Sequence, residues 1–473
     1  MSKLRFPLIL LLVLLVAAGV GLVVLWPHLE GEPPRITIEP PLTHLGKDTP
    51  VKLVVEDRQQ GVGRVRVILA QNGQERQLAE EIVPAGTPAG RGLEPAVYNI
   101  VIKPRDLGLI EGEATLVVEA RDRSYRNWLQ GNLARVDLKL VVDLTPPRLA
   151  DLSGMIYLTH GGTGVAVYQV DDPEAAHGVT VGQLSFTGVA PWQGRDRDRM
   201  CYFAYPVELA PGADIRLWAR DRAGNQTTAP LDVRFKNKKF RDDTLQLSDR
   251  FLEAVEPRFA GMYPPEADTP LKKFVWINEK LRAKNHQAVV AATSELTPYQ
   301  LWRGVFLRPE GKTTAGFGDH RTYYHQKDKV SQSLHLGIDL AHTARSAVPA
   351  AAAGRVTFAG ELGIYGNAVA IDHGQGVYTL YGHLSELAVR PGQNVARDEA
   401  LGRSGTTGLA LGDHLHFSVL VGGVFVSPTE WWDPHWIQDN VNLRFKEAGL
   451  TPPLAPGAGS APAAPPAPAG KAN

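Results

Sequence analysis

Histidine and aspartate gather in the last third of the chain, at a spacing that could bind a metal ion. Nine of the 14 histidines lie between residues 320 and 435. Three short patterns stand out there: His335-Leu-Gly-Ile-Asp339, Tyr381-Gly-His383 and His414-Leu-His416-Phe417. Two imidazoles and one carboxylate are a common set of catalytic zinc ligands, with a fourth position left for water. The patterns therefore predict a metal site in this part of the chain.

The third pattern predicts a strand, because its apolar alternation continues through Val419 and Leu420. Residues two apart on a strand point to the same face, so His414 and His416 should lie side by side. One of them could bind a metal ion while the other contacts the water bound to it. In the first pattern, Gly337 argues against a helix, and a strand with a bend would let residues 335 and 339 reach one ion. A lone pair of histidines would more often be an ordinary surface or core pair, but two paired patterns and a third histidine favour metal binding.

These patterns resemble the signatures of the lysostaphin/LytM-type M23 metallopeptidases. The motifs that carry the resemblance, in the order and spacing of the family, are Phe317-Gly318, His335-x-x-x-Asp339, Pro349-Ala-Ala-Ala-Ala-Gly354, Gly366-Asn367, Tyr381-Gly-His383, Gly402-Arg-Ser-Gly-Thr-Thr-Gly408 and His414-x-His416. The resemblance implies a compact, mainly antiparallel β domain with its site in a groove.

The resemblance also implies a role for each site residue. One zinc ion per catalytic domain would be held by His335, Asp339 and His416, with His383 and His414 as the catalytic pair beside it. Such a site hydrolyses a peptide bond by attack of a zinc-bound water assisted by histidines. We assign His414 as the general base and His383 as the group that orients the water or stabilises the oxyanion. These two roles can be exchanged without conflict with the sequence.

Two further residues and two departures from the family pattern concern the groove. Asn367 and Arg321 are candidate substrate contacts, although an ordinary surface charge is an equally good interpretation of Arg321. Asp398 occupies a turn where the family usually has glycine; aspartate tolerates such turns, so a loop should change while the site stays intact. The stretch 318–334 carries extra polar residues and could form a longer groove wall.

The N-terminus predicts a membrane anchor. An apolar run from Phe6 to Trp26 follows Lys3 and Arg5, and it is long enough to cross a hydrocarbon layer of about 30 Å as a helix. The run continues well beyond its small residues, which favours an uncleaved anchor over a cleaved signal. The basic residues before it place the N-terminus inside. We therefore expect residues 1–28 to form a cytoplasmic tip and a single-pass anchor in the inner membrane, with the rest periplasmic or otherwise extracytoplasmic.

The first half of the chain predicts β-structure. Alternating strand patterns recur there, and a short repeat appears at Glu119–Asn127 and again at Trp218–Gln226. A Thr-Pro-Pro segment at residues 145–147 separates the two copies. We expect two β-sandwich modules, residues 34–145 and 146–237, that resemble immunoglobulin-like domains. They would act as spacers or bind other envelope proteins.

The predicted architecture is thus mainly β and multidomain. Residues 240–304 read as a helical linker, in which Ser248 caps one helix and Pro270 lies in the first turn of another. The M23-type peptidase domain would span residues 305–436. Residues 451–473 form a tail rich in proline and alanine that cannot bury a core and should be disordered.

Composition excludes some classes of function. Lysine plus arginine and aspartate plus glutamate both number 50, so no basic excess favours a nucleic-acid partner. The single cysteine, Cys201, excludes an internal disulfide and every zinc site built from several cysteines.

Resemblance and topology together imply a zinc-dependent endopeptidase that cuts peptide bonds in peptidoglycan stems or cross-bridges. The expected partners are peptidoglycan and, through the N-terminal helix, the membrane. One alternative is a LytM-type regulator that activates other wall hydrolases without hydrolysis; such relatives have lost metal ligands, whereas here the whole set is present. The other alternative is an envelope scaffold whose peptidase is latent.

Overall fold

The computed structural model describes residues 12, 14–16, 19–20, 23, 26–191 and 194–452. The predicted anchor lies largely outside these residues, as does most of the predicted disordered tail, so both stay predictions. Within the described part, no helix combines the length and the apolar character needed to cross a bilayer. The short 3-10 helix η1 spans Trp26–Leu29.

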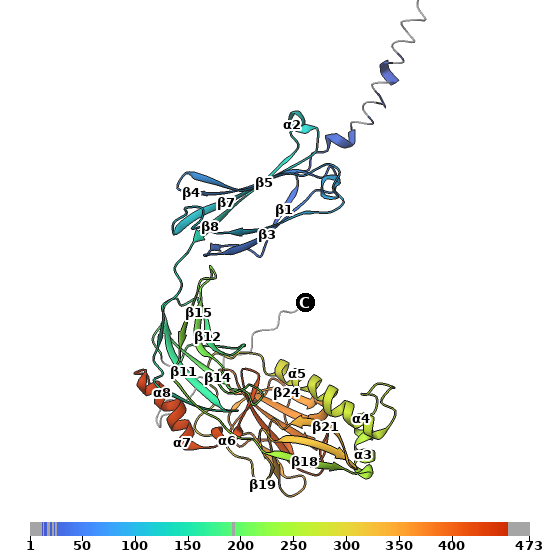
Figure 1. Ribbon diagram of the computed structural model, residues 1–473, viewed down its shortest axis with the longest axis vertical. Coiled ribbons are helices and arrows are strands. Elements are labelled where there is room, and N and C mark those ends of the chain that lie inside the picture. The colour runs from blue at the N-terminus through green and yellow to red at the C-terminus, as the bar shows by residue number, and fades with distance from the viewer. Residues whose placement is uncertain are drawn as a thin grey trace, which may run out of the picture. The chain divides into compact units, whose positions relative to one another are not determined.

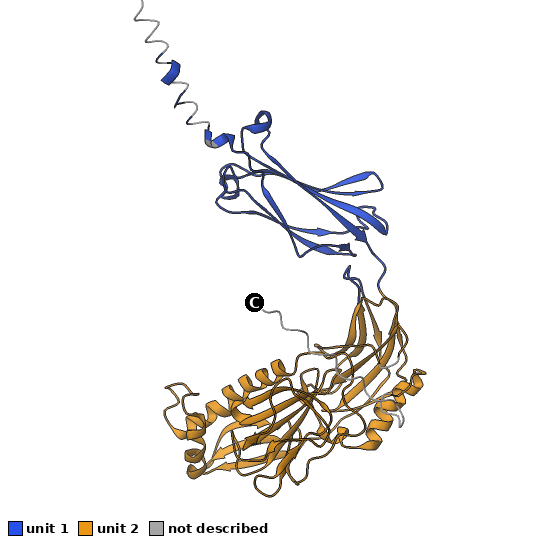
Figure 2. Ribbon diagram, turned by 180° about the vertical axis from the view of Figure 1, so that it is seen from behind, with its two compact units in different colours: residues 1–146, 220–226 blue, residues 147–219, 227–473 orange. Residues whose placement is uncertain are grey.

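The chain is mainly β, as its alternating patterns predict, and it divides into two compact units (Figure 2). The first unit comprises residues 1–146 and 220–226, and the second comprises residues 147–219 and 227–473.

The first unit contains two sheets that enclose a common core of apolar side chains. One sheet has the order β2-β8-β7-β4-β5 and the other the order β1-β3-β6 (Figure 1). Alternate residues of β3, such as Val51, Leu53 and Val55, point into the core, as period-two alternation requires. The elements are β1 (Arg35–Glu39), β2 (His44–Leu45), β3 (Thr49–Glu56), β4 (Val62–Gln71), β5 (Gln74–Ile82), η2 (Ala89–Arg91), β6 (Ala96–Ile102), β7 (Gly112–Asp122), α2 (Arg126–Leu129) and β8 (Leu133–Val142).

The second unit begins with another group of short strands. They form the sheets β14-β11-β9 and β13-β12-β15-β16, and a parallel pair, β10 with β17. The elements are β9 (Leu149–Asp151), β10 (Ile156–Thr159), β11 (Thr163–Val170), β12 (Ala176–Val181), β13 (Leu184–Thr187), β14 (Asp198–Ala204), β15 (Ile215–Arg220), β16 (Gln226–Pro230) and β17 (Val233–Lys236).

This strand group and the C-terminal domain share one hydrophobic core, so they are not separated by a free linker. The ring centroids of Tyr202 and Trp431 lie 5.9 Å apart. The Thr163 backbone N–H donates to the Glu430 carboxylate over 2.8 Å. The sequence predicted two independent domains here. It could not reveal the shared core, because the contacts join segments more than 200 residues apart and leave no local pattern.

The segment predicted as a helical linker, 240–304, begins with a strand instead. β18 (Asp242–Leu247) pairs in parallel with β20, and β20 pairs with β21. The predicted cap is present: the Ser248 hydroxyl accepts a hydrogen bond from the Phe251 N–H, at 3.2 Å. The helical elements are α3 (Asp249–Val255), η3 (Glu256–Phe259), α4 (Pro270–Trp276), η4 (Ile277–Leu281) and α5 (Arg282–Ala292). α4 and α5 run along the side of the domain that contains β21 and β24 (Figure 1).

The C-terminal domain is built on an antiparallel sheet with the order β19-β22-β30-β26-β25-β24-β28, to which β31 adds beside β30. Its neighbours β23, β29 and β27 form a smaller sheet. The strands are β19 (Lys312–Ala315), β20 (His320–His325), β21 (Asp328–Leu334), β22 (Ile338–Ala341), β23 (Ala347–Pro349), β24 (Gly354–Glu361), β25 (Asn367–Asp372), β26 (Val377–Leu384), β27 (Glu386–Leu387), β28 (Asn394–Val395), β29 (Ala400–Arg403), β30 (Leu415–Val421) and β31 (Val424–Val426). The helices are η5 (Gly363–Tyr365), α6 (Pro428–Trp431), α7 (Pro434–Trp436), η6 (Ile437–Asn442) and α8 (Leu443–Glu447).

Candidate metal centre and active site

Strand register brings the predicted site residues together at the middle of the large sheet. Asp339 on β22 lies directly opposite His416 on β30, and His416 in turn lies opposite Gly382 on β26. His383 is therefore next to the same point. His335 lies in the bend between β21 and β22, so the spacing of four residues is bridged by a turn into a strand, as predicted.

Three acceptor atoms converge on one point. Nε2 of His335 lies 2.9 Å from Oδ1 of Asp339 and 3.2 Å from Nδ1 of His416, and the last two atoms are 2.9 Å apart. All three side chains are buried. Ligands of a tetrahedral zinc ion with bonds of about 2.0–2.1 Å lie roughly 3.3 Å apart. The triangle is thus close to one face of a zinc tetrahedron.

The ring tautomers leave lone pairs facing that point. Nδ1–H of His335 donates to the Gly316 carbonyl at 2.7 Å, so Nε2 carries the lone pair. The Ser418 hydroxyl donates to the Leu336 carbonyl at 2.8 Å and accepts from Nε2–H of His416 at 3.0 Å, which leaves the lone pair on Nδ1. Two lone pairs and a carboxylate oxygen at this separation repel one another unless a cation lies between them. The residues therefore fit a metal ion.

Glycine is required beside this cluster. A Cβ atom on Gly337 would lie 2.5 Å from the His416 ring and 2.7 Å from the Ser418 hydroxyl. Any larger residue would displace the ring or its hydrogen-bond partner, so the glycine in the first pattern makes room for a ligand from the third.

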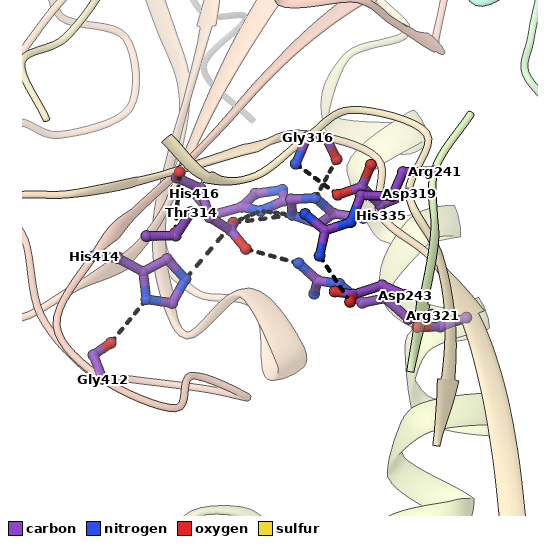
Figure 3. A network of polar contacts seen from close by, with 12 residues as sticks. Arg241, Asp243, Thr314, Gly316, Asp319, Arg321, His335, Gly412, His414 and His416 are labelled. Carbon is purple, nitrogen blue, oxygen red and sulfur yellow. Dashed lines mark hydrogen bonds and ion pairs between the residues drawn. The ribbon is translucent and has the colours of Figure 1, made fainter. Parts of the chain in front are cut away.

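Arg321 holds the other oxygen of the ligand carboxylate. Its Nη2 lies 2.9 Å from Oδ2 of Asp339, and both side chains are mostly buried (Figure 3). Arg321 was expected as a substrate contact or a surface charge. Its burial and its ion pair with Asp339 do not fit an ordinary surface charge, and the substrate contact stays a prediction.

His383 and His414 lie side by side next to the ligand triangle, with ring centroids 4.7 Å apart. Nδ1–H of His383 donates to the Thr407 carbonyl, and Nδ1–H of His414 to the Gly412 carbonyl, each at 2.8 Å. Both rings therefore have a free lone pair on Nε2, and that of His414 lies 3.6 Å from Oδ1 of Asp339 (Figure 3). Burial, followed by the charges of His414 and His416, lowers the pKa of His383 well below its ordinary value.

Asn367, the other candidate substrate contact, turns away from the groove. Its side-chain amide donates to the Leu384 carbonyl at 3.2 Å, and its backbone N–H donates to the Thr407 hydroxyl at 3.0 Å. It ties β25 to the end of β26 and is not among the described residues that line the groove. A role in substrate binding stays a prediction for this residue.

The geometry places a triangle of candidate metal ligands and two further paired histidines in one groove, and the family comparison agrees. Residues 333–428 match the model of Peptidase family M23. The C-terminal domain is an M23 domain.

Curated relatives match a part of this chain. The DD-carboxypeptidase/endopeptidase Mpg of Neisseria meningitidis is 46% identical over 95 residues, which is 20% of this chain and 22% of that protein. The peptidoglycan DD-endopeptidase ShyA of Vibrio cholerae is 47% identical over 58 residues, 12% of this chain and 14% of that protein. The murein hydrolase activator NlpD of Escherichia coli is 32% identical over 136 residues, 28% of this chain and 32% of that protein. The chain thus spans about a third or less of the length of each of these relatives.

Solved structures are also similar to parts of this chain. A putative M23 peptidase from Pseudomonas aeruginosa is 22% identical with a TM-score of 0.38, covering 58% of this chain and 94% of that one. The catalytic domain of lysostaphin from Staphylococcus simulans is 26% identical with a TM-score of 0.22, covering 26% of this chain and 92% of that one.

The groove of the M23 domain has a volume of about 430 Å³. The stretch 318–334, predicted as a longer wall, forms the β20–β21 hairpin and contributes Arg321 and Tyr323. Asp398, the other predicted departure from the family pattern, lies in a turn with φ +73°, a backbone conformation that glycine adopts most easily and aspartate tolerates.

Part of the wall comes from outside the residues that match the family. Asp243, Leu245, Phe251, Phe274 and Arg282 line the groove. The sequence did not identify these residues as part of the groove. The apolar residues around Phe274 recur at helical spacing, and such spacing is equally typical of a helix that packs against a core.

Proposed function

We propose that this protein is a zinc-dependent endopeptidase that hydrolyses peptide bonds in peptidoglycan stems or cross-bridges. The observation that carries the proposal is the triangle of His335, Asp339 and His416. Its three acceptor atoms lie 2.9–3.2 Å apart, with both ring tautomers fixed so that lone pairs face inward. A set of three protein ligands, which leaves the fourth position of zinc open for water, is typical of a catalytic site.

The chemistry divides between a metal ion and the two further histidines. A zinc ion would be held by His335, Asp339 and His416, and when bound it would supply a water of near-neutral pKa and polarise the scissile carbonyl. His414 takes the proton, because its Nε2 lone pair faces the ligand cluster while the Gly412 carbonyl holds its Nδ1–H. His383 accepts a hydrogen bond at Nε2 and so orients the attacking water. Arg321 keeps the Asp339 carboxylate in the orientation that presents Oδ1 to the metal.

The substrate class rests on relatives and on the predicted topology. The curated relatives are named as the DD-carboxypeptidase/endopeptidase Mpg and the peptidoglycan DD-endopeptidase ShyA, and this chain is 46% identical to Mpg over 95 residues and 47% identical to ShyA over 58 residues. The apolar run at residues 6–26 supports an anchor in the inner membrane, with the catalytic domain in the periplasm where peptidoglycan lies. The first β module, which resembles an immunoglobulin-like domain in its sequence pattern, would act as a spacer or contact other envelope proteins.

A non-hydrolytic regulator is the second candidate, since relatives named NlpD are murein hydrolase activators. The complete set of ligands and histidines favours hydrolysis over that role.

Zinc analysis of residues 26–452, purified without added metal, separates the two candidates. The enzyme proposal expects close to one zinc ion per chain and cleavage of cross-linked stem peptides. A metal-free protein that cleaves nothing after zinc is added, yet stimulates another wall hydrolase, would replace it with the regulator.

A further inference from the structure

A second arginine lines the groove, and it has no acidic partner. Arg282 is the first residue of α5, outside the M23 match, and its side chain is partly buried in the groove wall. Among the described residues, no carboxylate lies within ion-pair distance of it. The groove's other arginine, Arg321, is already paired with Asp339, and the groove's Asp243 is paired with Arg241 at 3.0 Å.

The Arg282 side chain is fixed by a neutral amide. Oδ1 of Asn278 accepts from Nε and Nη2 of Arg282, at 3.2 and 2.8 Å. Asn278 is itself buried, and its Nδ2 donates to the Ser331 hydroxyl at 2.8 Å and the Gln332 carbonyl at 3.3 Å. Strand β21 therefore orients the amide, and the amide orients the guanidinium. An amide sets direction but does not neutralise charge.

The guanidinium keeps unused donors. Nε and Nη2 are engaged by Asn278, while no described residue accepts a hydrogen bond from Nη1. Burial lowers the pKa of Arg282, because removal from water disfavours the charged form of the guanidinium. A partly buried, oriented guanidinium without an acidic partner is a strong site for a planar anion, because two parallel N–H groups match two carboxylate oxygens.

We propose that Arg282 binds a free carboxylate of the peptide substrate and so selects peptides that carry one near the bond that is cut. This inference rests on the proposed peptidase function and adds a specificity residue to it. The carboxylate can be the C-terminal group of a stem peptide or a side-chain group within it. Amide-capped versions of the same peptide should be poor substrates.

The test compares matched synthetic stem peptides in which each free carboxylate is amidated in turn. For the unaltered protein, amidation of one particular carboxylate should raise KM about tenfold to a hundredfold, the range for a charged hydrogen bond. Arg282→Gln should raise KM for the free-acid peptide by a similar factor and change KM for the matching amide by no more than about twofold. Identification of that carboxylate distinguishes the C-terminal from the side-chain source.

Lys284→Gln is the matched control, because Lys284 is exposed on the same helix. It should leave both KM values unchanged. Thermal unfolding and zinc content of Arg282→Gln show whether the variant is folded and loaded. The inference is overturned if the folded, loaded variant slows acid and amide peptides equally, or slows neither.

Calorimetry on zinc-free protein separates this inference from the proposed function. The free-acid peptide should bind more tightly than its amide, and Arg282→Gln should abolish the difference. If no peptide is cut by the zinc-loaded protein, the peptidase proposal fails. Equal binding of the acid and the amide by the zinc-free protein would rule out the proposed role of Arg282 and leave the peptidase proposal unaffected.

Discussion

Asp339 and His416 face each other across β22 and β30, with Oδ1 and Nδ1 only 2.9 Å apart. The two residues are 77 positions apart in the sequence, and the register of one antiparallel strand pair alone makes them neighbours. The other site residues are placed around this pair.

Replacement of His416 by alanine should abolish zinc binding. The change leaves two ligands, and a catalytic zinc site needs three from the protein. Inductively coupled plasma mass spectrometry should find less than a tenth of the unaltered zinc content, with hydrolysis lost in parallel. A variant that keeps zinc in full would show that His416 is not a ligand.

Replacement of His414 by alanine should separate metal binding from catalysis. Its ring lies beside the triangle, 3.6 Å from Oδ1 of Asp339, and is not one of the converging ligands. Zinc content should stay near one ion per chain, while kcat falls about a hundredfold to ten-thousandfold, the range for a lost general base. Full activity in the loaded variant would move the base role to His383.

Replacement of Arg321 by glutamine should weaken the site without removing a ligand. The Asp339 carboxylate would lose the partner that fixes its second oxygen, and loss of such a contact typically costs about tenfold to a hundredfold in metal affinity or activity. Competition with a chelator measures the zinc affinity. Lys327→Gln, at the exposed turn of the same hairpin, serves as the control. Equal zinc affinity and equal rates in the two variants would contradict the positioning role.

Much of the site was predictable, because most of its residues occur in short sequence motifs. The residue types and spacing of His335, Asp339 and His416 identify a ligand set without any knowledge of the sheet. The contact of Arg321 with Asp339 was not predictable, since it depends on how the β20–β21 hairpin packs over β22. The same holds for Arg282, which enters the groove from a helix about 50 residues before the first motif.

The fold was predictable to a similar degree. Alternating apolar residues identify the strands, since burial of one face leaves a local period. These patterns do not identify which strands pair. The strand β18 was missed because its parallel partner, β20, lies more than 70 residues further along the chain.

Glu430 should make the stability of the second unit depend on pH. Burial raises the pKa of its carboxyl from the ordinary 4.5 to about 8. Between these values the folded chain keeps a proton that the unfolded chain has lost. The contribution to the free energy of unfolding is therefore full below pH 4.5 and is lost as the pH rises through about 8.

Urea unfolding at pH 5.5 and pH 8.5 measures this effect. The unaltered protein should lose more stability between the two values than Glu430→Gln, which cannot ionise. Identical losses in both proteins would show that Glu430 titrates normally in the folded chain.

Residues 147–219 should stabilise the M23 domain. Contacts such as Tyr202 with Trp431 and Thr163 with Glu430 belong to one core. A fragment of residues 240–452 should therefore unfold at a clearly lower temperature than a fragment of residues 147–452, measured by scanning calorimetry. Equal unfolding temperatures would show that the shared core contributes nothing.

Mass spectrometry of the material released from purified peptidoglycan sacculi tests the central claim most directly. The zinc-loaded protein should release fragments whose masses correspond to hydrolysis of one kind of peptide bond. Release should stop with a chelator and return when zinc is restored. Intact sacculi after incubation with fully zinc-loaded, folded protein would contradict the account.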